Sequence, residues 1–218
     1  MNIFGFADFH GDIESAKRAS HLVSLERPSL VVVAGDLANR DIQLARHILE
    51  ELSRSAQRVF FVPGNMDDPG LATWKDTERI VCLHAKAVPH NLITFVGLGG
   101  SVISPFKTPF EFGEAEAGRA LAEATQTSSS QNLVLVSHCP PKNTKLDLAG
   151  GTRHVGSEAV RRFIDERKPM LVICGHIHEA QGVDSIGHVP VVNVGPARHG
   201  NYASIFLNQE ARIELRRF

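Results

Sequence analysis

The sequence is poor in cysteine, in net charge and in long apolar segments. Three cysteines in 218 residues are an odd and sparse set, which argues against a disulfide scaffold and predicts a protein of the reducing cytoplasm. Lys and Arg number 23 against 24 Asp and Glu, so the formal net charge of −1 provides no field for holding nucleic acid or an acidic membrane surface. No apolar run approaches the roughly 20 residues of a membrane span, and residues 1–8 do not resemble a signal peptide. We therefore expect neither a membrane protein nor a nucleic-acid partner.

What the sequence does contain is a series of short apolar runs separated by amphipathic stretches. Five runs have strand length and are continuously apolar, which is typical of sheets buried on both faces: Ile3–Ala7, Leu30–Ala34, Val59–Val62, Leu133–Val136 and Met170–Cys174. Apolar periodicity and helix propensity predict helices over Ile13–Leu25, Asp41–Leu52 and Glu114–Ala124, and a fourth that opens at Ser157. Three more strands close the chain, the last two as a hairpin: Val191–Val194, Ala203–Leu207 and Ala211–Leu215. This alternation predicts an α/β fold in a single domain over residues 1–218.

Two stretches do not fit this alternation. Gly97–Gly113 is rich in glycine, proline and phenylalanine and is predicted to be a long loop. It is either a lid over a site or a surface loop that Phe106, Phe110 and Phe112 pin to the core. Thr125–Asn132 is polar and is predicted to be a simple connector.

Chemistry-bearing residues follow directly after each of the five apolar runs. Carboxyl ends of strands line the ligand crevice in open α/β sheets, so these residues are expected to converge. In an extended segment, residues i and i+2 point to the same side, which pairs Asp8 with His10 and His176 with His178. The complete set holds two Asp, one Asn and four of the 11 histidines: Asp8, His10, Asp36, Asn65, His138, His176 and His178.

These seven donors indicate a site for two metal ions. Oxygen and imidazole donors without thiolate suit Mn, Fe, Co, Ni or Zn. Seven donors exceed what one ion takes in an open site, but they fit two ions that share one carboxylate. A pair of ions about 3.5–4 Å apart can clamp the attacking and leaving oxygens of a displacement at phosphorus, so the residue types point to phosphate ester hydrolysis. Any one fragment alone would be read as a cap or a turn; five in order are a much stronger signal.

At this point the chain resembles the calcineurin-like metallophosphoesterase superfamily. The motifs that carry the resemblance are Asp8-Phe9-His10, Gly35-Asp36, Gly64-Asn65, His138 and Gly175-His176-Ile177-His178. The resemblance implies a four-layer α-β-β-α sandwich of two mixed sheets with outer helices and no cap domain. It also implies two divalent ions, with manganese favoured. The first would be held by Asp8, His10, Asp36 and His178, and the second by Asp36, Asn65, His138 and His176.

The implied reaction is in-line attack on phosphorus by a hydroxide that bridges the two ions, without a covalent phosphoenzyme. Asp36, Asn65 and His138 are the predicted catalytic residues, and the Asn65 amide would also reach the phosphate. The superfamily often places a histidine after Gly-Asn as the acid for the leaving group, but here Met66 follows, and a thioether cannot donate a proton. Small phosphodiesterases without that histidine often act on activated esters. Further candidates for substrate contacts are Arg40, His154 and Arg198, although a solvated surface position is the default for each.

The leading interpretation is therefore a metal-dependent phosphoesterase acting on a small-molecule phosphodiester or phosphomonoester, with the diester favoured. The competing interpretation is a non-catalytic metal-binding scaffold for protein interactions on the same fold, although all seven donor positions are intact. A DNA-repair nuclease would need a DNA-binding cap and a basic surface, which the sequence does not show. The sequence is compatible with a homo-oligomer. Asp12 is predicted to cap its helix, and Cys139 and Cys174 to be small packing residues.

Overall fold

The computed structural model describes residues 1–126 and 132–218 and contains two mixed six-stranded sheets. The first sheet has the order β16 (Ala211–Arg217), β15 (Asn201–Leu207), β1 (Asn2–Phe6), β2 (Leu30–Ala34), β3 (Val59–Val62) and β4 (Ile80–Cys82). The second has the order β13 (Gly182–Ile186), β14 (Val189–Asn193), β12 (Leu171–Cys174), β9 (Leu133–Ser137), β6 (Ile93–Leu98) and β5 (Ala87–His90).

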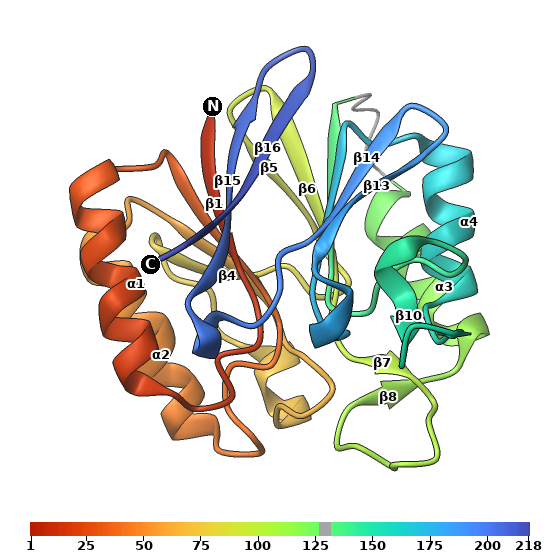
Figure 1. The fold of residues 1–218 in the computed structure, drawn as a ribbon, viewed down its shortest axis with the longest axis horizontal. Helices are drawn as coiled ribbons and strands as arrows, with labels where there is room; N and C mark the ends of the chain where they lie inside the picture. The colour runs from red at the N-terminus through yellow and green to blue at the C-terminus, as the bar shows by residue number, and fades with distance from the viewer. Residues whose placement is uncertain (127–131) are drawn as a thin grey trace.

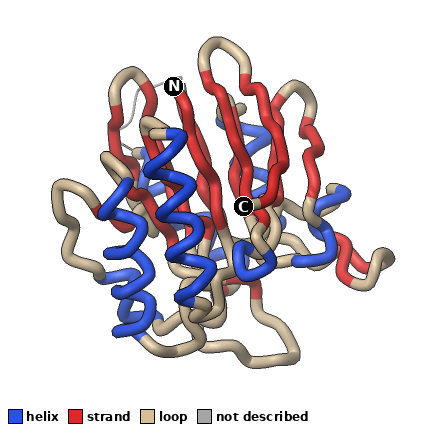
Figure 2. The backbone as a smooth tube through the Cα atoms, turned by 60° about the vertical axis from the view of Figure 1, so that its left-hand side comes forward, coloured by secondary structure: helices blue, strands red, loops and turns tan. Residues whose placement is uncertain are grey.

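The described residues form four α-helices, and these cover the outer faces of the two sheets, an arrangement that Figures 1 and 2 show. Helices α1 (Ile13–Glu26) and α2 (Ile42–Ser55) pack on the first sheet, and α3 (Glu114–Thr125) and α4 (Glu158–Arg167) on the second. A third apolar cluster lies between the sheets themselves. The predicted four-layer sandwich is thus confirmed. None of the helices in the described ranges is long and apolar enough to cross a membrane.

The burial pattern of β1 shows how one face of the first sheet packs against helices and the other against the second sheet. Phe4 and Phe6 lie in the cluster that contacts α1 and α2, whereas Ile3 lies in the cluster between the sheets. Alternate side chains of a strand point to opposite faces, so a continuous apolar run is what a doubly covered strand needs. The helices begin where capping side chains are available: Asp12 accepts a hydrogen bond from Ser15 N, as expected, and Ser157 accepts one from Val160 N.

Four strands of the two six-stranded sheets were not expected from the sequence: β4, β5, β6 and β13. Three of them are edge strands: β5 and β13 are only partly covered and lack a continuous apolar run, whereas β4 is apolar and buried but only three residues long. The fourth, β6, contains Gly97 and Leu98, so the loop predicted from Gly97 in fact begins only after Leu98. A Cβ on Gly97 would lie 2.3 Å from Leu83 Cβ, which shows that this glycine serves close packing inside a strand.

The rest of the predicted loop does run over the surface, apart from two-residue strands β7 (Ser101–Val102) and β8 (Glu111–Phe112), which pair in parallel. Phe112 is buried and pins the loop, but Phe106 is 79% exposed, so its predicted role as a pin is wrong. The predicted connector Thr125–Asn132 lies mostly outside the described residues, and Thr125 itself is the last residue of α3.

Candidate metal centre

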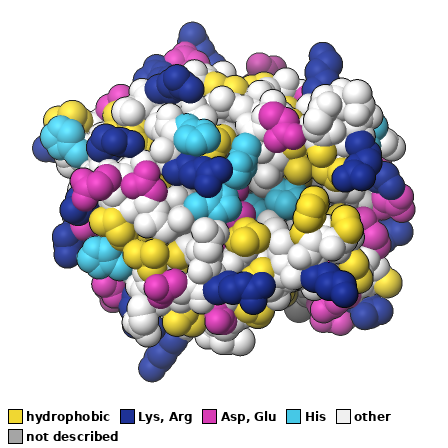
Figure 3. All heavy atoms as spheres, turned by 60° about the horizontal axis from the view of Figure 1, so that its bottom comes forward, with side chains coloured by type: hydrophobic (Ala, Val, Ile, Leu, Met, Phe, Trp, Pro, Cys, Tyr) yellow, Lys and Arg dark blue, Asp and Glu magenta, His cyan; other side chains and the backbone are white. Residues whose placement is uncertain are grey.

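The seven candidate donors all follow strands whose C-terminal ends meet at the lower edge of both sheets in Figure 1. The first sheet supplies the donors after β1, β2 and β3, and the second sheet supplies those after β9 and β12. The donor atoms form two groups, and within each group all donor atoms lie within 4.8 Å of one another. One group is Asp8 with His10 and His178, and the other is Asp8 with Asp36 and His138. Figure 3 turns this face forward and shows histidine side chains gathered around a central hollow, next to a basic side chain.

One half of the cluster surrounds the buried Asp8 carboxylate. Asp8 Oδ2 accepts a hydrogen bond from the His176 backbone N–H at 3.2 Å, and Oδ1 lies 3.6 Å from His178 Nε2. The Nε2 atoms of His10 and His178 face each other at 3.2 Å. The other nitrogen of His10, Nδ1, lies 2.9 Å from Asn39 Oδ1, which orients the ring.

The other half is built around Asp36 and His138. Asp36 lies between the halves, because its Oδ2 is 3.6 Å from His10 Nε2 and its Oδ1 is 3.5 Å from His138 Nε2. His138 Nδ1 lies 2.7 Å from the Ala34 carbonyl oxygen, and Nε2 lies 2.9 Å from Asn65 Oδ1. The rings of His138 and His176 are 5.0 Å apart between centroids.

The hydrogen-bond chemistry of this arrangement fits a cation. The Ala34 carbonyl can only accept, so Nδ1 carries the proton in the neutral form of the His138 ring, and Nε2 presents a lone pair. That lone pair faces two further acceptor atoms, Asn65 Oδ1 and Asp36 Oδ1. In addition, Asp8 Oδ1 is buried and has no hydrogen-bond partner among the described residues. Converging acceptors without protons are costly unless a positive ion satisfies them.

Burial and charge shift the pKa values of the cluster in opposite directions. Burial and the neighbouring Asp8 carboxylate raise the pKa of Asp36 to about 7. Burial, together with the His138 ring, lowers the pKa of His176 to about 3. The neighbouring Asp8 carboxylate raises the pKa of His178. Buried carboxylates beside imidazoles are a donor set that binds divalent metals.

The backbone of the cluster is strained at the donor positions. Asp8, His10, Asp36 and His176 adopt the left-handed region, with φ of 58°, 50°, 52° and 73°. Each such residue costs about 1–3 kcal/mol and persists only where the surroundings impose it, often at functional sites. The premise that Asp8–His10 and His176–His178 are extended pairs is therefore wrong. His10 and His178 do meet beside Asp8, but the His176 ring lies against His138 instead.

The motif glycines leave room for the donors. A Cβ on Gly64 would lie 2.0 Å from Asp36 Oδ1, and one on Gly35, which has φ of +90°, would lie 2.4 Å from His138 Nδ1. Real Cβ atoms do not approach so closely. Glycine precedes Asp36 and Asn65 because the neighbouring donor occupies the space that a side chain would need.

Asp67 organises the site, and the sequence analysis gave it no role. Its buried carboxylate accepts hydrogen bonds from the N–H groups of Leu37 at 3.0 Å, Ala38 at 2.7 Å and Gly64 at 2.7 Å. It therefore ties the loop after β2 to the loop after β3. Burial and the Asp36 carboxylate raise the pKa of Asp67 to about 7, although the three N–H groups act in the opposite direction. The sequence did offer one indication of this role, because Asp67 lies only two residues after the candidate donor Asn65.

The additional candidates are placed differently from one another. Arg198 lies at the rim of the cluster, where Nη2 is 3.4 Å from His178 Nδ1. The Arg40 side chain is exposed, and its backbone N–H donates to the Met66 carbonyl at 2.8 Å. His154 Nδ1 lies 2.7 Å from Asp147 Oδ1. Cys139 and Cys174 are buried free thiols, as expected for packing residues.

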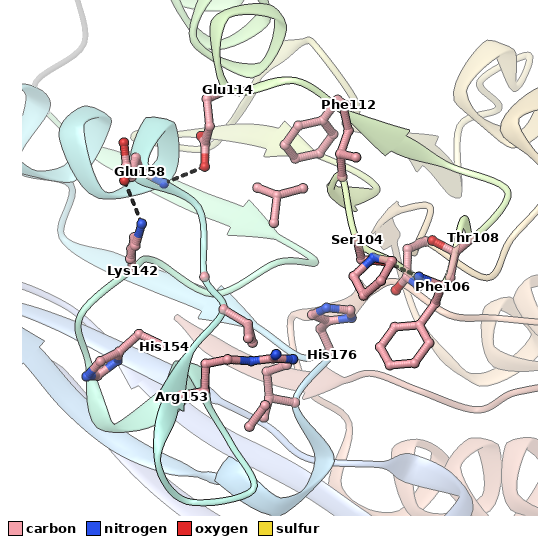
Figure 4. Close-up of a pocket in the computed structure, with 18 of the residues that line it drawn as sticks. Ser104, Phe106, Thr108, Phe112, Glu114, Lys142, Arg153, His154, Glu158 and His176 are labelled. Carbon is pink, nitrogen blue, oxygen red and sulfur yellow. Dashed lines mark hydrogen bonds and ion pairs between the residues drawn. The ribbon is translucent and has the colours of Figure 1, made fainter.

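A cavity of about 640 Å³ adjoins the cluster and includes Asn65 and His176 in its wall. Most of its remaining wall comes from the loop between β6 and α3 and from the segment around β10 (Leu148–Ala149) and β11 (Arg153–His154). In Figure 4 the His154 ring points away from His176, whereas the Arg153 guanidinium points toward the side where His176 lies. Arg153 was not among the residues singled out from the sequence.

Comparison with known proteins agrees with the fold. The model of the calcineurin-like phosphoesterase family matches residues 1–180. The uncharacterized protein MJ1162 of Methanocaldococcus jannaschii is 33% identical over 208 residues, which are 93% of this chain and 91% of that protein. Among solved structures, TT1561 of Thermus thermophilus has a TM-score of 0.77 at 17% identity and covers 98% and 97% of the two chains. A dimetal phosphatase from Danio rerio has a TM-score of 0.67 at 13% identity and covers 100% and 96%.

The four-layer fold and the cluster of carboxylates and imidazoles at its strand ends define a metal-dependent phosphoesterase. The chain belongs to the calcineurin-like phosphoesterase family.

Proposed function

We propose that this protein hydrolyses small-molecule phosphate esters, phosphodiesters in preference to monoesters, with two divalent ions, manganese being favoured. We place it in the cytoplasm as a single domain. Asp8, His10, Asp36 and His178 would hold one ion, and Asp36, Asn65, His138 and His176 the other. The observation that carries the proposal is the convergence of lone pairs from His138 Nε2, Asp36 Oδ1 and Asn65 Oδ1, beside the unpartnered Asp8 Oδ1.

The position of Asp36 supports its role as the shared ligand. Its two oxygens lie within 3.6 Å of His10 and His138, which belong to different halves of the cluster. The Met66 N–H donates to Asp36 Oδ1 at 2.8 Å and fixes the orientation of the carboxylate. A bound pair of divalent ions would supply an activated water at neutral pH and would neutralise charge on the phosphoryl oxygens.

Asn65 is suited to orient the phosphate. Its Oδ1 is turned toward His138, so its NH₂ group is free to donate to a phosphate oxygen from the wall of the cavity. Asn65 is itself held in place by the adjoining loop, because its carbonyl accepts a hydrogen bond from Phe110 N at 3.0 Å. Arg198, at the rim near His178, is proposed to contact a phosphate oxygen from the other side, with Arg40 and His154 as weaker candidates.

The leaving group receives no proton from Met66. General-acid assistance contributes roughly 10²–10⁴ in rate when a poor leaving group departs. We therefore propose that activated esters, whose leaving groups depart unprotonated, are hydrolysed faster than alkyl esters.

The test combines metal analysis with a substrate pair that shares one leaving group. Purified protein reconstituted with Mn²⁺ is expected to hold close to two ions per chain and to hydrolyse methyl p-nitrophenyl phosphate faster than p-nitrophenyl phosphate. Two ions without hydrolysis of either ester would favour the scaffold interpretation. Fewer than one ion per chain after reconstitution would contradict the proposed centre.

A further inference from the structure

The cavity beside the cluster has a mouth that is unusually apolar for an exposed surface. Two of its wall residues, Ile103 and Phe106, are large apolar side chains that are 71% and 79% exposed. Deeper in the wall lie Phe112 and Ile177, which are buried. The other exposed large apolar side chains of the described residues lie outside this cavity. Exposed apolar side chains gathered on one concave surface mark a binding site for an apolar group.

The loop that carries these side chains is held in a defined shape. Both Ser104 and Thr108 donate to the Glu111 carboxylate through their backbone N–H and hydroxyl groups, at distances between 2.7 and 3.3 Å. The loop is also tied to the candidate metal centre, because Phe110 N donates to the Asn65 carbonyl. Phe106 is therefore kept at the mouth of a preformed cavity, and binding there does not require the loop to be ordered first.

The Lys, Arg and Glu side chains of the cavity wall are engaged in ion pairs or hydrogen bonds with other residues, with the exception of Arg153. Lys142 pairs with Glu158 at 2.5 Å. The Glu114 carboxylate accepts hydrogen bonds from the residues that open α4. The Arg153 side chain is exposed and makes no hydrogen bond or ion pair within the described residues. Since Arg153 points toward the side of His176 in Figure 4, the cavity offers one available cation next to the candidate metal centre.

We propose that this cavity selects the substrate: it takes a bulky apolar or aromatic group esterified to the phosphate, while Arg153 contacts a phosphate oxygen. The inference rests on the proposed function and narrows its substrate class to organic phosphodiesters with an apolar ester group. The volume of about 640 Å³ lies within the range of small-molecule pockets. A guanidinium suits a phosphate because its planar donors match two oxygens.

Phosphonates test this site without turnover, because their carbon–phosphorus bond is not an ester. Binding of phenylphosphonate and methylphosphonate to the Mn²⁺-loaded protein is measured by titration calorimetry. Phenylphosphonate is expected to bind roughly tenfold tighter, since its ring leaves water for an apolar wall. The double variant Ile103→Ser, Phe106→Ser should reduce this ratio to below about threefold. The matched control Phe206→Ser changes a half-exposed phenylalanine on β15 and should leave the ratio unchanged.

Arg153 is tested with the same two probes. Arg153→Gln should weaken both phosphonates by a similar factor, roughly fivefold to tenfold, and should leave their ratio intact. The control Arg212→Gln removes an exposed arginine on β16 and should change neither affinity.

The results separate this inference from the proposed function. Equal affinity for the two phosphonates, or a ratio that survives the double variant, would overturn the apolar site. Unchanged phosphonate binding by Arg153→Gln would overturn the role of that residue. If the protein hydrolyses phosphate esters but does not bind phenylphosphonate more tightly than methylphosphonate, only the inference that the cavity binds an apolar group is contradicted. If the protein binds phenylphosphonate more tightly but hydrolyses no ester, the proposed function is contradicted and the apolar binding site in the cavity is not.

Discussion

The candidate metal centre and the cavity beside it adjoin but are built on different principles. In the centre, Asp8, Asp36 and His138 are at most 3% exposed, and several donors sit on strained backbone. At the cavity mouth, Ile103 and Phe106 are more than 70% exposed on the loop that joins the two-residue strands β7 and β8. The first region is determined by its contacts with the core of the fold. The second is determined by one loop and one short hairpin.

This difference separates the residues that the fold restricts from those it leaves free to change. At the centre, side chains are packed so closely that one residue takes the space that a larger neighbour would need. Asp36, for example, lies where a side chain on Gly64 would have to be. At the cavity mouth, a changed side chain meets mainly solvent. Members of a family with one centre can therefore differ in substrate through such loops, because loops carry specificity on a rigid scaffold. Mutations should reveal the same contrast.

The largest effect is expected from Gly64→Ala. Its Cβ would lie 2.0 Å from Asp36 Oδ1 and 2.1 Å from Asp36 N, so the loops after β2 and β3 would have to separate. We expect a loss of about 3 kcal/mol or more in the free energy of unfolding, with metal binding abolished. Denaturant unfolding and metal analysis measure both effects. The control is Gly113→Ala, whose Cβ would meet nothing within 4 Å. Equal stability of the two variants would contradict the crowding argument.

Asp36→Asn is expected to affect activity more than stability. Removing the shared carboxylate should lower the rate of ester hydrolysis by at least about 10²–10³, the usual loss for one preorganised electrostatic group. Metal content should fall at both positions, whereas Asp8→Asn should mainly empty one. The control Asp165→Asn changes an exposed carboxylate on α4 that pairs with Arg161. Normal metal content and turnover in Asp36→Asn would disprove the ligand assignment.

Asn39→Ala tests a residue that touches a donor without being one. Asn39 orients His10 through a contact of 2.9 Å, and loss of such support typically weakens metal affinity about 10–100-fold. Competition with a metal-binding dye measures the change. Asn39→Asp keeps the oxygen acceptor and is expected to restore most of the affinity. If both variants bind metal as tightly as the natural sequence, His10 does not depend on Asn39.

The stability of chelator-treated protein should depend on pH through Asp36. Its pKa of about 7 in the folded chain exceeds the ordinary value of 3.8, so the folded state binds this proton more tightly. The stabilisation is therefore complete below about pH 4 and is lost as the pH rises toward 7. Asp67 and His176 titrate in both proteins, and the Asp36 carboxylate also raises the pKa of Asp67. The difference in unfolding free energy between natural protein and Asp36→Asn therefore reports Asp36 together with its effect on Asp67. That difference should decrease with rising pH, and a constant difference would refute the assignment.

The smallest effect is expected at the cavity mouth. Ile103→Ser alters a side chain that is 71% exposed, and its free energy of unfolding should change by no more than about 0.5 kcal/mol. Denaturant unfolding next to Gly64→Ala gives the comparison directly. A loss of stability as large as that of Gly64→Ala would show that the loop supports the core.

The sequence predicted those parts of the fold in which burial imposes a pattern. The central strands β1, β2, β3, β9 and β12 have both faces covered, so almost all of their covered residues are apolar. The edge strand β13 alternates exposed and covered positions and contains Asp184 and Ser185, while β5 includes Pro89. Such strands form because a neighbour offers hydrogen-bonding groups, and this is not visible in their own composition.

The candidate centre was predictable to a similar extent and for a related reason. Only a few residue types, such as Asp, Asn and His, can donate to a metal ion. Here they follow strands that can be recognised by their continuous apolar runs. The geometry could not be predicted in the same way, since the left-handed conformations of Asp8 and His176 depend on contacts with distant loops. The cavity left a weaker signal: the loop over Gly97–Gly113 was one candidate for a lid over a site, and it forms much of the wall. An isolated arginine such as Arg153 looks like an ordinary surface residue until the loops are placed around it.

The position of β1 in the first sheet has a consequence for folding. This strand pairs with β2 on one side and with β15 on the other, where Asn2 lies opposite Phe206. The first donors of the centre, Asp8 and His10, therefore follow a strand whose partner on one side is more than 190 residues away in the sequence. Contacts of such long range form slowly, because a long loop must close first. During synthesis the centre cannot be complete until His176 and His178 have left the ribosome, so high-affinity metal uptake would report that the second sheet has joined the first.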